Sequence, residues 1–340
     1  MLVLATHVSI NESQFDHQEP AAFRRLLLRW YSRHKRDLPW RQDRNPYRVW
    51  VSEIMLQQTR VAAVMDHYQK FLRRFPTVKK LAAANEADVL AAWSGLGYYR
   101  RARMLRSAAL IVVEQCHGQV PSDVASLRSL PGIGRYSAAA IASIAFGEPL
   151  AVVDGNVERV LSRLSGRQLP QPAAWSLAEK LLHRQRPGDF NQAMMELGAT
   201  ICLPAAPICS ACPVFSLCKT RGRLPAMQKP SRARRAVIHY SLHHRNGSVL
   251  LVQRAKNASL MPGMWELPEL PVSSSPSNGW FKLRHSITVT NYEVRVYPDG
   301  TQSANGQTVG VWKRNSELSK LALTGLARKI LRAAKVIEFR

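Results

Sequence analysis

The chain has 340 residues, 46% of them hydrophobic, and 48 Lys and Arg against 23 Asp and Glu give it a net charge of +25. This length suits about two domains, no apolar run is long enough to cross a bilayer, and five cysteines in a reducing compartment do not suggest a disulfide framework. The positive excess points to a polyanionic partner, with nucleic acid first, and a merely solvated basic surface is the alternative.

Residues 1–20 are predicted to form an N-terminal tail. The segment MLVLATHVSINESQFDHQEP lacks the charged-then-apolar order of a secretory signal. We therefore expect a cytoplasmic protein with no membrane partner.

The stretch LPWRQDRNPYRVWVSEIMLQQTRVAAVMDHY predicts helix, because apolar residues recur in it at helical spacing. Glu53 lies beside this apolar stripe and shares a face with Gln57. Partial burial raises the pKa of a carboxyl group, as a general acid working near neutrality requires. The alternative is a surface glutamate in a first helical turn.

Two further stretches combine glycine with aromatic or basic residues. In GLGYYRRARMLR, Tyr98 and Tyr99 lie between glycines and a basic cluster, where they either meet DNA or belong to the core. In LPGIGRYSAAAIASIAFG, Gly132 and Gly134 allow a tight turn into an Ala-rich helix, whose first N–H groups are suited to hold a phosphate.

The stretch AVVDGNVERV brings one carboxylate, Asp154, to a turn after an apolar run. Neighbouring amides and Asn156 can keep this carboxylate ionised. An ordinary helix N-cap aspartate is the alternative, and the two roles are compatible.

Four of the five cysteines fall in CLPAAPICSACPVFSLC, at positions 202, 209, 212 and 218. Structural zinc sites usually take two short Cys pairs from separate hairpins, and this segment has one. A single loop around an iron–sulfur cluster fits the spacing of Cys202, Cys209, Cys212 and Cys218 better. Cys116, in an apolar helical run, is interpreted as a packing residue.

The composition changes after Cys218. Residues 219–235 hold seven basic residues and no acid, which predicts a linker suited to lie along phosphate. Residues 236–340 then begin a second domain, in which AVIHYSLHHRNGSVLLVQR predicts two strands around an Asn-Gly turn.

The motifs together resemble a known family. The cysteine spacing is similar to the [4Fe–4S] loop of the endonuclease III and MutY DNA glycosylases, and LPWR, PYRVW and SEIMLQQT resemble its adenine-excising MutY branch. Residues 236–340, with AKNASLMPGMWELPEL, resemble the MutT (Nudix)-like domain of that branch. No Asp or Glu lies between Pro271 and Tyr292, so this domain is expected to bind rather than to hydrolyse a nucleotide.

The resemblance implies a fold and an activity. The fold is an all-helical helix-hairpin-helix glycosylase domain over residues 21–218, with the cluster loop at 202–218, followed by a mixed α/β domain. The implied activity is hydrolysis of the N-glycosidic bond of adenine mispaired with 8-oxoguanine or guanine in double-stranded DNA. The enzyme is expected to be a monomer associated with a bacterial nucleoid.

The resemblance also assigns roles. Glu53 protonates adenine, Asp154 stabilises the cationic sugar, and Tyr136 and Asn156 orient them; Tyr136 stands where bifunctional relatives carry a Schiff-base lysine. Residues assigned to the adenine pocket or to DNA are Trp40, Arg41, Leu56, Gln57, Gln58, Thr59, Tyr98, Gly132, Gly134 and Gln192, and Thr288 is assigned to the opposing base. Two alternatives stay open: an endonuclease III-like glycosylase and lyase, and a non-catalytic iron–sulfur DNA-binding protein.

Overall fold

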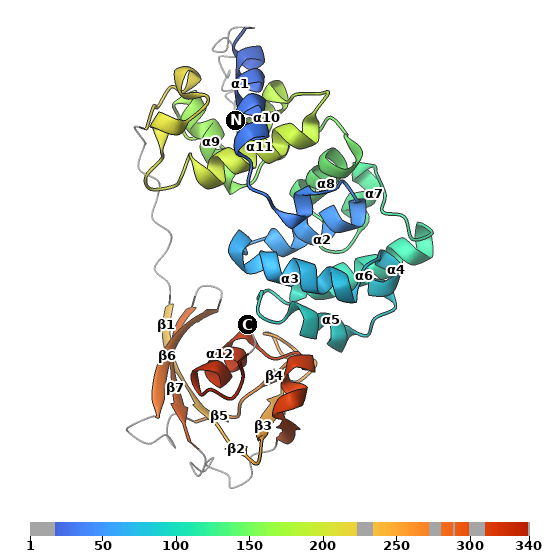
Figure 1. The fold of residues 1–340 in the computed structure, drawn as a ribbon, viewed down its shortest axis with the longest axis vertical. Coiled ribbons are helices and arrows are strands. Elements are labelled where there is room, and N and C mark those ends of the chain that lie inside the picture. Colours follow the sequence, from blue (N-terminus) through green and yellow to red (C-terminus); the bar gives the residue numbers. More distant parts are fainter. Residues whose placement is uncertain (1–17, 223–233, 272–279, 288–289, 299–309, 339–340) are drawn as a thin grey trace, which may run out of the picture. The chain divides into compact units, whose positions relative to one another are not determined.

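The computed structural model describes residues 18–222, 234–271, 280–287, 290–298 and 310–338. These residues form two compact units. Unit 1 takes the described residues of Met1–Glu53, Pro121–Ser129 and Ile133–Met227, and unit 2 those of Ile54–Val120, Leu130–Gly132 and Gln228–Arg340. The helical part of the chain therefore contributes to both units, and Figure 1 labels its elements.

Unit 1 is helical. Its core contains the apolar stripe of α9, whose Val157, Val160, Leu161 and Leu164 are all buried, because the spacing places them on one helical face. Phe23 of α1 and Phe190 of α11 meet edge to face in the same core. The elements, including the end of α2 that passes into unit 2, are α1 (Gln18–His34), η1 (Pro39–Arg41), α2 (Pro46–Leu56), α7 (Val124–Ser129), α8 (Arg135–Ile141), η2 (Ala142–Phe146), α9 (Gly155–Ser165), α10 (Gln171–Leu181), α11 (Pro187–Thr200), η3 (Cys209–Ala211) and η4 (Phe215–Leu217).

Two of the helices in the N-terminal part of unit 2 begin at side-chain caps. The Thr77 side chain accepts a hydrogen bond from the Lys80 N–H at the start of α4, and Asn85 accepts one from Asp88 at the start of α5. The buried Phe71 ring packs against Trp93 at 5.7 Å between centroids. These helices are α3 (Val61–Arg74), α4 (Val78–Ala82), α5 (Glu86–Trp93) and α6 (Arg100–Gln115).

The C-terminal part of unit 2 contains two sheets. One has the order β5-β1-β7-β6, with β1 and β7 parallel, and in the other β3 pairs with β2, β4 and β8. Buried Leu326, Ile330 and Leu331 of α12 (Gly325–Ala333) pack into their core. The other elements are β1 (Arg234–Ser241), β2 (His244–Arg245), β3 (Ser248–Gln253), β4 (Trp265–Glu266), β5 (Glu269–Leu270), β6 (Phe281–Ile287), β7 (Thr290–Tyr297), β8 (Val311–Arg314) and η6 (Asn315–Lys320).

The predicted Asn-Gly turn is present, but it joins shorter strands than expected. Asn246 and Gly247 have φ of 49° and 66°, the left-handed values that a two-residue hairpin turn requires. On the N-terminal side of this turn, the strand that pairs with β3 is the two-residue β2, whereas β1 pairs with β5 and β7 in the other sheet. Turn chemistry fixed the hairpin, but it carried no information about the partner of β1.

The predicted fold class is confirmed: a helical part is followed by a mixed domain of helix and strands. The domain boundaries at 21–218 and 236–340 stay a prediction, because most of the tail and of the linker lie outside the described residues. No helix in the described ranges is both long and apolar enough to span a membrane.

Candidate active site

Glu53 is buried on α2 and is only 5% exposed. Its neighbours on that helix include the fully buried Trp50 and Val51. Within the described chain, its Oε2 has no hydrogen-bond partner. Burial raises the pKa of Glu53 to about 7, and the negative charge of Asp154 adds to the rise, whereas the Tyr136 hydroxyl and Arg41 oppose it. The predicted partly apolar environment of this carboxyl is therefore confirmed.

Tyr136 is the second residue of α8, directly after the glycine turn. Its hydroxyl lies 3.3 Å from Met195 Sδ. Burial raises the pKa of Tyr136 well above its usual range, and the charges of Glu53 and Asp154 raise it further. The side chain is thus a neutral hydrogen-bond donor beside two carboxyls, and it has no amine with which to form an imine.

Asp154 is the N-cap of α9, as one of the two sequence interpretations predicts. Its Oδ1 accepts a hydrogen bond from the Val157 N–H at 2.8 Å, and its Oδ2 accepts one from Asn156 Nδ2 at 2.9 Å. Both oxygens are therefore held by hydrogen-bond donors.

A polar chain leads from Asp154 toward the cysteine loop. Asn156 Oδ1 accepts from Arg159 Nη2 at 2.9 Å, and Arg159 Nε donates to the Cys202 carbonyl at 2.8 Å. Gly198 on α11 permits this approach, because a Cβ there would lie 2.6 Å from the Asn156 Cβ. These hydrogen bonds link Asn156, and through it Asp154, to the segment that carries the first cysteine.

A second buried carboxyl, that of Glu196 on α11, was not predicted from the sequence. Its side chain is 1% exposed and forms ion pairs with Arg36 at 2.7 Å and Arg41 at 2.8 Å. Burial alone would raise the pKa of Glu196, but hydrogen bonds from Arg36 and Arg41 outweigh it and lower the pKa to about 2. The sequence signal that could have indicated a buried, paired carboxyl is the single acidic residue in the apolar stretch FNQAMMELGATIC. Arg41, predicted in the adenine pocket, is thus fixed by an ion pair.

The other three cysteines of the loop affect the pKa of Cys212. Burial raises the pKa of Cys212 to about 11; the Val214 N–H opposes the rise, and Cys202, Cys218 and Cys209 add to it. Arg163 Nη1 donates to Cys202 Sγ at 3.1 Å. In the described chain no three His, Cys, Asp or Glu side chains lie close enough to hold one metal ion. An iron–sulfur cluster binds its cysteines on separate irons, so its four ligands need not converge on one ion.

The predicted DNA-contacting residues of unit 2 include two with strained backbones. Gln58 and Tyr98 have φ of 55° and 48°, left-handed values that non-glycine residues adopt at a cost. The buried Arg101 supports both segments: its Nη1 donates to the Gln57 carbonyl, its Nη2 donates to Thr59 Oγ1 at 3.0 Å, and it lies under the Tyr98 ring. Tyr98 is 48% exposed, which rules out the interpretation as a core residue. Tyr99 is buried.

The remaining predicted positions have simpler surroundings. Gly132 has φ of 81°, and a Cβ there would lie 2.9 Å from the Met104 Cβ, so glycine is required. Gly134 is the N-cap of α8, Trp40 is buried in η1, and Leu56 ends α2. Gln192 lies on α11, whereas Thr288 lies outside the described residues.

Comparison with known proteins gives one family. A model of the HhH-GPD superfamily, described as base excision DNA repair protein, matches residues 51–181. The chain is 48% identical to a human adenine DNA glycosylase over 242 residues, which are 67% of this chain and 44% of the human protein. It is 39% identical to an adenine DNA glycosylase of Buchnera aphidicola subsp. Baizongia pistaciae over 203 residues, 58% of each chain.

Two solved structures are similar to part of this chain. A thermostable thymine-DNA glycosylase is 30% identical with a TM-score of 0.57, covering 61% of this chain and 98% of the glycosylase. A non-covalent endonuclease III–DNA complex is 23% identical with a TM-score of 0.52, covering 59% of this chain and 96% of that enzyme, and it shows the fold alone. The chain spans about half the length of the curated relatives it matches.

Proposed function

The chain belongs to the HhH-GPD superfamily of base excision DNA repair proteins, and from that premise we propose that it is a monofunctional adenine DNA glycosylase. Its substrate is adenine mispaired with 8-oxoguanine or guanine in double-stranded DNA. The observation that carries the proposal is Glu53, a buried carboxyl with a pKa raised to about 7 by burial, electrostatically coupled to Asp154. Relatives named adenine DNA glycosylase, at 38–49% identity, support the choice of base.

Two carboxyls with different surroundings suit this reaction. Adenine leaves deoxyribose poorly unless a ring nitrogen is protonated, and its departure leaves positive charge on the sugar. Glu53, whose pKa of about 7 leaves a substantial share of it protonated at neutral pH, supplies the proton. Asp154, held by the Val157 N–H and by Asn156, stabilises the cationic centre until water attacks.

Tyr136 and Asn156 act by orienting the carboxyls. The Tyr136 hydroxyl interacts with Glu53, and Asn156 donates to Asp154. Because Tyr136 has no amine, the proposed enzyme hydrolyses the glycosidic bond and leaves the DNA backbone intact.

The target base has to leave the duplex to reach these groups. We assign Gln57, Gln58 and Tyr98 to the gap that it leaves, since two of them are held in strained conformations by buried Arg101. The β-rich domain, including Thr288, is assigned to the opposing base. DNA as the partner agrees with the charge of +25, and the proposed setting is a monomer at the bacterial nucleoid.

Cys202, Cys209, Cys212 and Cys218 are proposed to hold a [4Fe–4S] cluster. Bound there, the cluster would fix the loop whose Cys202 carbonyl accepts from Arg159, and through Asn156 it would help to position Asp154. Protein purified without oxygen is expected to contain about four irons per chain. Stoichiometric zinc without iron would contradict this assignment.

A glycosylase assay on a panel of duplexes tests the function. The duplexes carry adenine opposite 8-oxoguanine, guanine or thymine, and oxidised pyrimidines opposite guanine. We expect alkali-labile sites only at adenine opposite 8-oxoguanine or guanine, and no strand break before alkali is added. Excision of oxidised pyrimidines with strand cleavage would instead indicate an endonuclease III-like lyase, and binding without excision would indicate a DNA-binding module.

A further inference from the structure

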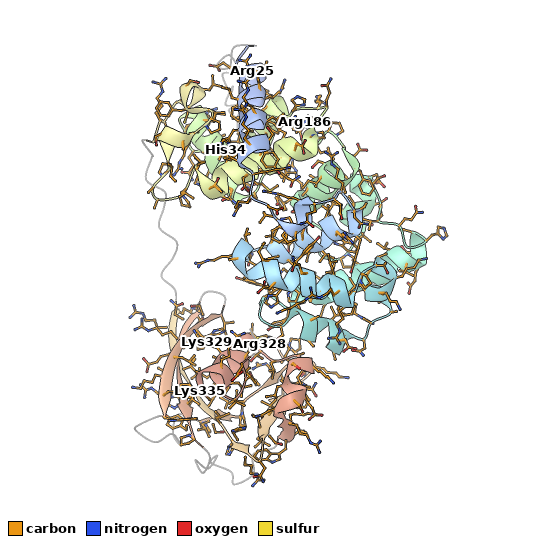
Figure 2. All side chains as sticks on the ribbon, viewed as in Figure 1. Arg25, His34, Arg186, Arg328, Lys329 and Lys335 are labelled. Carbon is orange, nitrogen blue, oxygen red and sulfur yellow. The ribbon has the colours of Figure 1, made fainter. Side chains whose placement is uncertain are left out.

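An open pocket of about 530 Å³ lies in unit 1, and none of the residues assigned to catalysis or to the cluster lines it. One wall is a face of α1 that carries Arg24, Arg25 and Arg29, and the segment between α10 and α11 adds His183 and Arg186. None of the lining residues is acidic; the others are Ala21, Leu28 and Ser32. Figure 2 labels Arg25 and Arg186 on these two elements.

Part of this cationic lining is held in place. Arg24 donates to the carbonyls of Leu181 at 2.9 Å and Lys180 at 2.8 Å, which ties α1 to the end of α10. Arg186 forms an ion pair with Asp189 at 2.8 Å. The Arg186 N–H donates to His183 Nδ1 at 3.2 Å, so the ring keeps its other nitrogen for a ligand.

The other two guanidinium groups have no such attachment. Arg25 and Arg29 are exposed, and within the described chain neither guanidinium group has a hydrogen-bond or ion-pair partner. They lie four residues apart on one helical face, where like charges destabilise a helix by a few tenths of a kcal/mol. Asp189 forms an ion pair with Arg186 of the lining, and it forms a second ion pair with Arg44. The pocket thus holds more positive charge than its surroundings neutralise.

We propose that this pocket is a second DNA contact, which binds phosphates of the backbone outside the segment that presents the target base. Arginine is suited to this ligand, because its planar fork binds phosphate oxygens through two hydrogen bonds. Arg24 and Arg186 supply fixed donors, and Arg25 and Arg29 close on the bound phosphate. Their mutual repulsion is relieved when the anion binds. The proposal concerns duplex DNA of any sequence and does not depend on which base is excised.

The test compares two double variants that lose the same charge. Arg25→Gln with Arg29→Gln removes the free guanidinium groups of the pocket. Arg33→Gln with Arg184→Gln removes two exposed arginines of the same two segments that do not line it. Affinity for an undamaged duplex is measured by fluorescence anisotropy over a range of salt concentrations. Thermal midpoints check that both variants are folded.

For the pocket variant we expect at least tenfold weaker binding near physiological salt. Its plot of log affinity against log salt should be shallower by about 1.8, since each lost phosphate contact removes about 0.9 from the slope. The control should keep a slope close to that of the unchanged protein. Equal slopes for the two variants would overturn the proposal.

Two further probes test whether the pocket binds an anion other than DNA. Inorganic phosphate and polyglutamate are each titrated against the unchanged protein and the pocket variant. If either binds only the unchanged protein while the DNA slopes of the two variants agree, the pocket serves a free phosphate or an acidic protein segment, and the proposal is wrong. Adenine excision is measured separately at saturating substrate, so a failure of the proposed function is distinguishable from a failure of this contact.

Discussion

Glu53 and Glu196 are both buried glutamates of unit 1, 5% and 1% exposed, yet their pKa values differ by several units. Burial raises the pKa of Glu53 to about 7, because the loss of hydration outweighs the attraction of the carboxylate to the positive charge of Arg41. For Glu196, burial is outweighed by hydrogen bonds from Arg36 and Arg41, and the pKa falls to about 2. The two buried carboxyls therefore differ in pKa because their hydrogen-bond partners differ.

The partners explain why the two residues have different uses. A carboxyl whose Oε2 has no hydrogen-bond partner in the described chain breaks no hydrogen bond at that atom when it is protonated. A carboxylate that holds two guanidinium groups cannot release them without leaving buried charge. We infer that Glu53 is suited to chemistry and Glu196 to holding Arg36 and Arg41 in place.

Glu53→Gln should give the largest effect, on excision. The amide keeps the shape of the side chain but cannot donate the proton, and general-acid catalysis contributes about 100- to 10,000-fold. We expect the single-turnover rate of adenine excision to fall by about 1,000-fold with little change in DNA affinity. Glu179→Gln is the matched control, since Glu179 Oε1 accepts from the Ala151 N–H and the amide oxygen can do the same. A Glu53→Gln enzyme within tenfold of the original rate would remove Glu53 from the mechanism.

Glu196→Gln should instead act on stability. It leaves two guanidinium groups without their anion, and breaking a buried ion pair costs about 3 kcal/mol or more. Urea denaturation at neutral pH should show this loss, whereas Glu53→Gln should be at least as stable as the unchanged chain. If the two variants had equal midpoints, the distinction between the carboxyls would fail.

The sequence predicted one half of this comparison. Helical spacing placed Glu53 beside an apolar stripe, and the DGN turn placed Asp154 at a helix start; both depend on neighbours within a few residues. Glu196 meets Arg36 and Arg41 across 160 and 155 positions, and no local pattern encodes a contact of that range. The pocket on α1 was missed for the same reason, because His183 and Arg186 reach that helix only in the fold.

The β-rich domain shows the same limit. The Asn-Gly turn could be predicted, because left-handed backbone needs particular residues at adjacent positions. The parallel pairing of β1 with β7, which joins Arg234 to Thr290, could not be predicted. The alternation of residues within a strand does not specify which distant strand it pairs with.

The pH dependence of stability should separate the two carboxyls by sign. The folded-state pKa of Glu53, about 7, is above its unfolded value of about 4.5, so its contribution is complete below pH 4.5 and is lost as the pH rises through 7. The folded-state pKa of Glu196, about 2, is depressed, so its contribution is present above pH 4.5 and is lost as the pH falls toward 2. Changes on the order of 1 to 3 kcal/mol are expected in each window.

Denaturation midpoints of the unchanged protein and the two glutamine variants measure these contributions. The advantage of Glu53→Gln over the unchanged chain should grow between pH 5 and pH 8, and the deficit of Glu196→Gln should shrink below pH 4. Parallel curves for all three proteins would mean that neither pKa is displaced.

Tyr136→Phe should give the smallest effect, and it tests what keeps the pKa of Glu53 from rising further. The Tyr136 hydroxyl lowers that pKa, so its removal should raise it above 7. Excision falls at alkaline pH as Glu53 loses its proton, and in the variant this fall should begin at a higher pH, by a fraction of a unit. The maximal rate should drop by tenfold or less, about 1.4 kcal/mol, because one orienting hydrogen bond is lost while both carboxyls remain.

Tyr31→Phe is the control, since Tyr31 is a buried tyrosine of the same unit with a pKa raised to about 12 by burial, and it has no part in the pKa shift of Glu53. A pH profile that moves equally in both variants, or that moves to lower pH in Tyr136→Phe, would show that the hydroxyl does not act on Glu53.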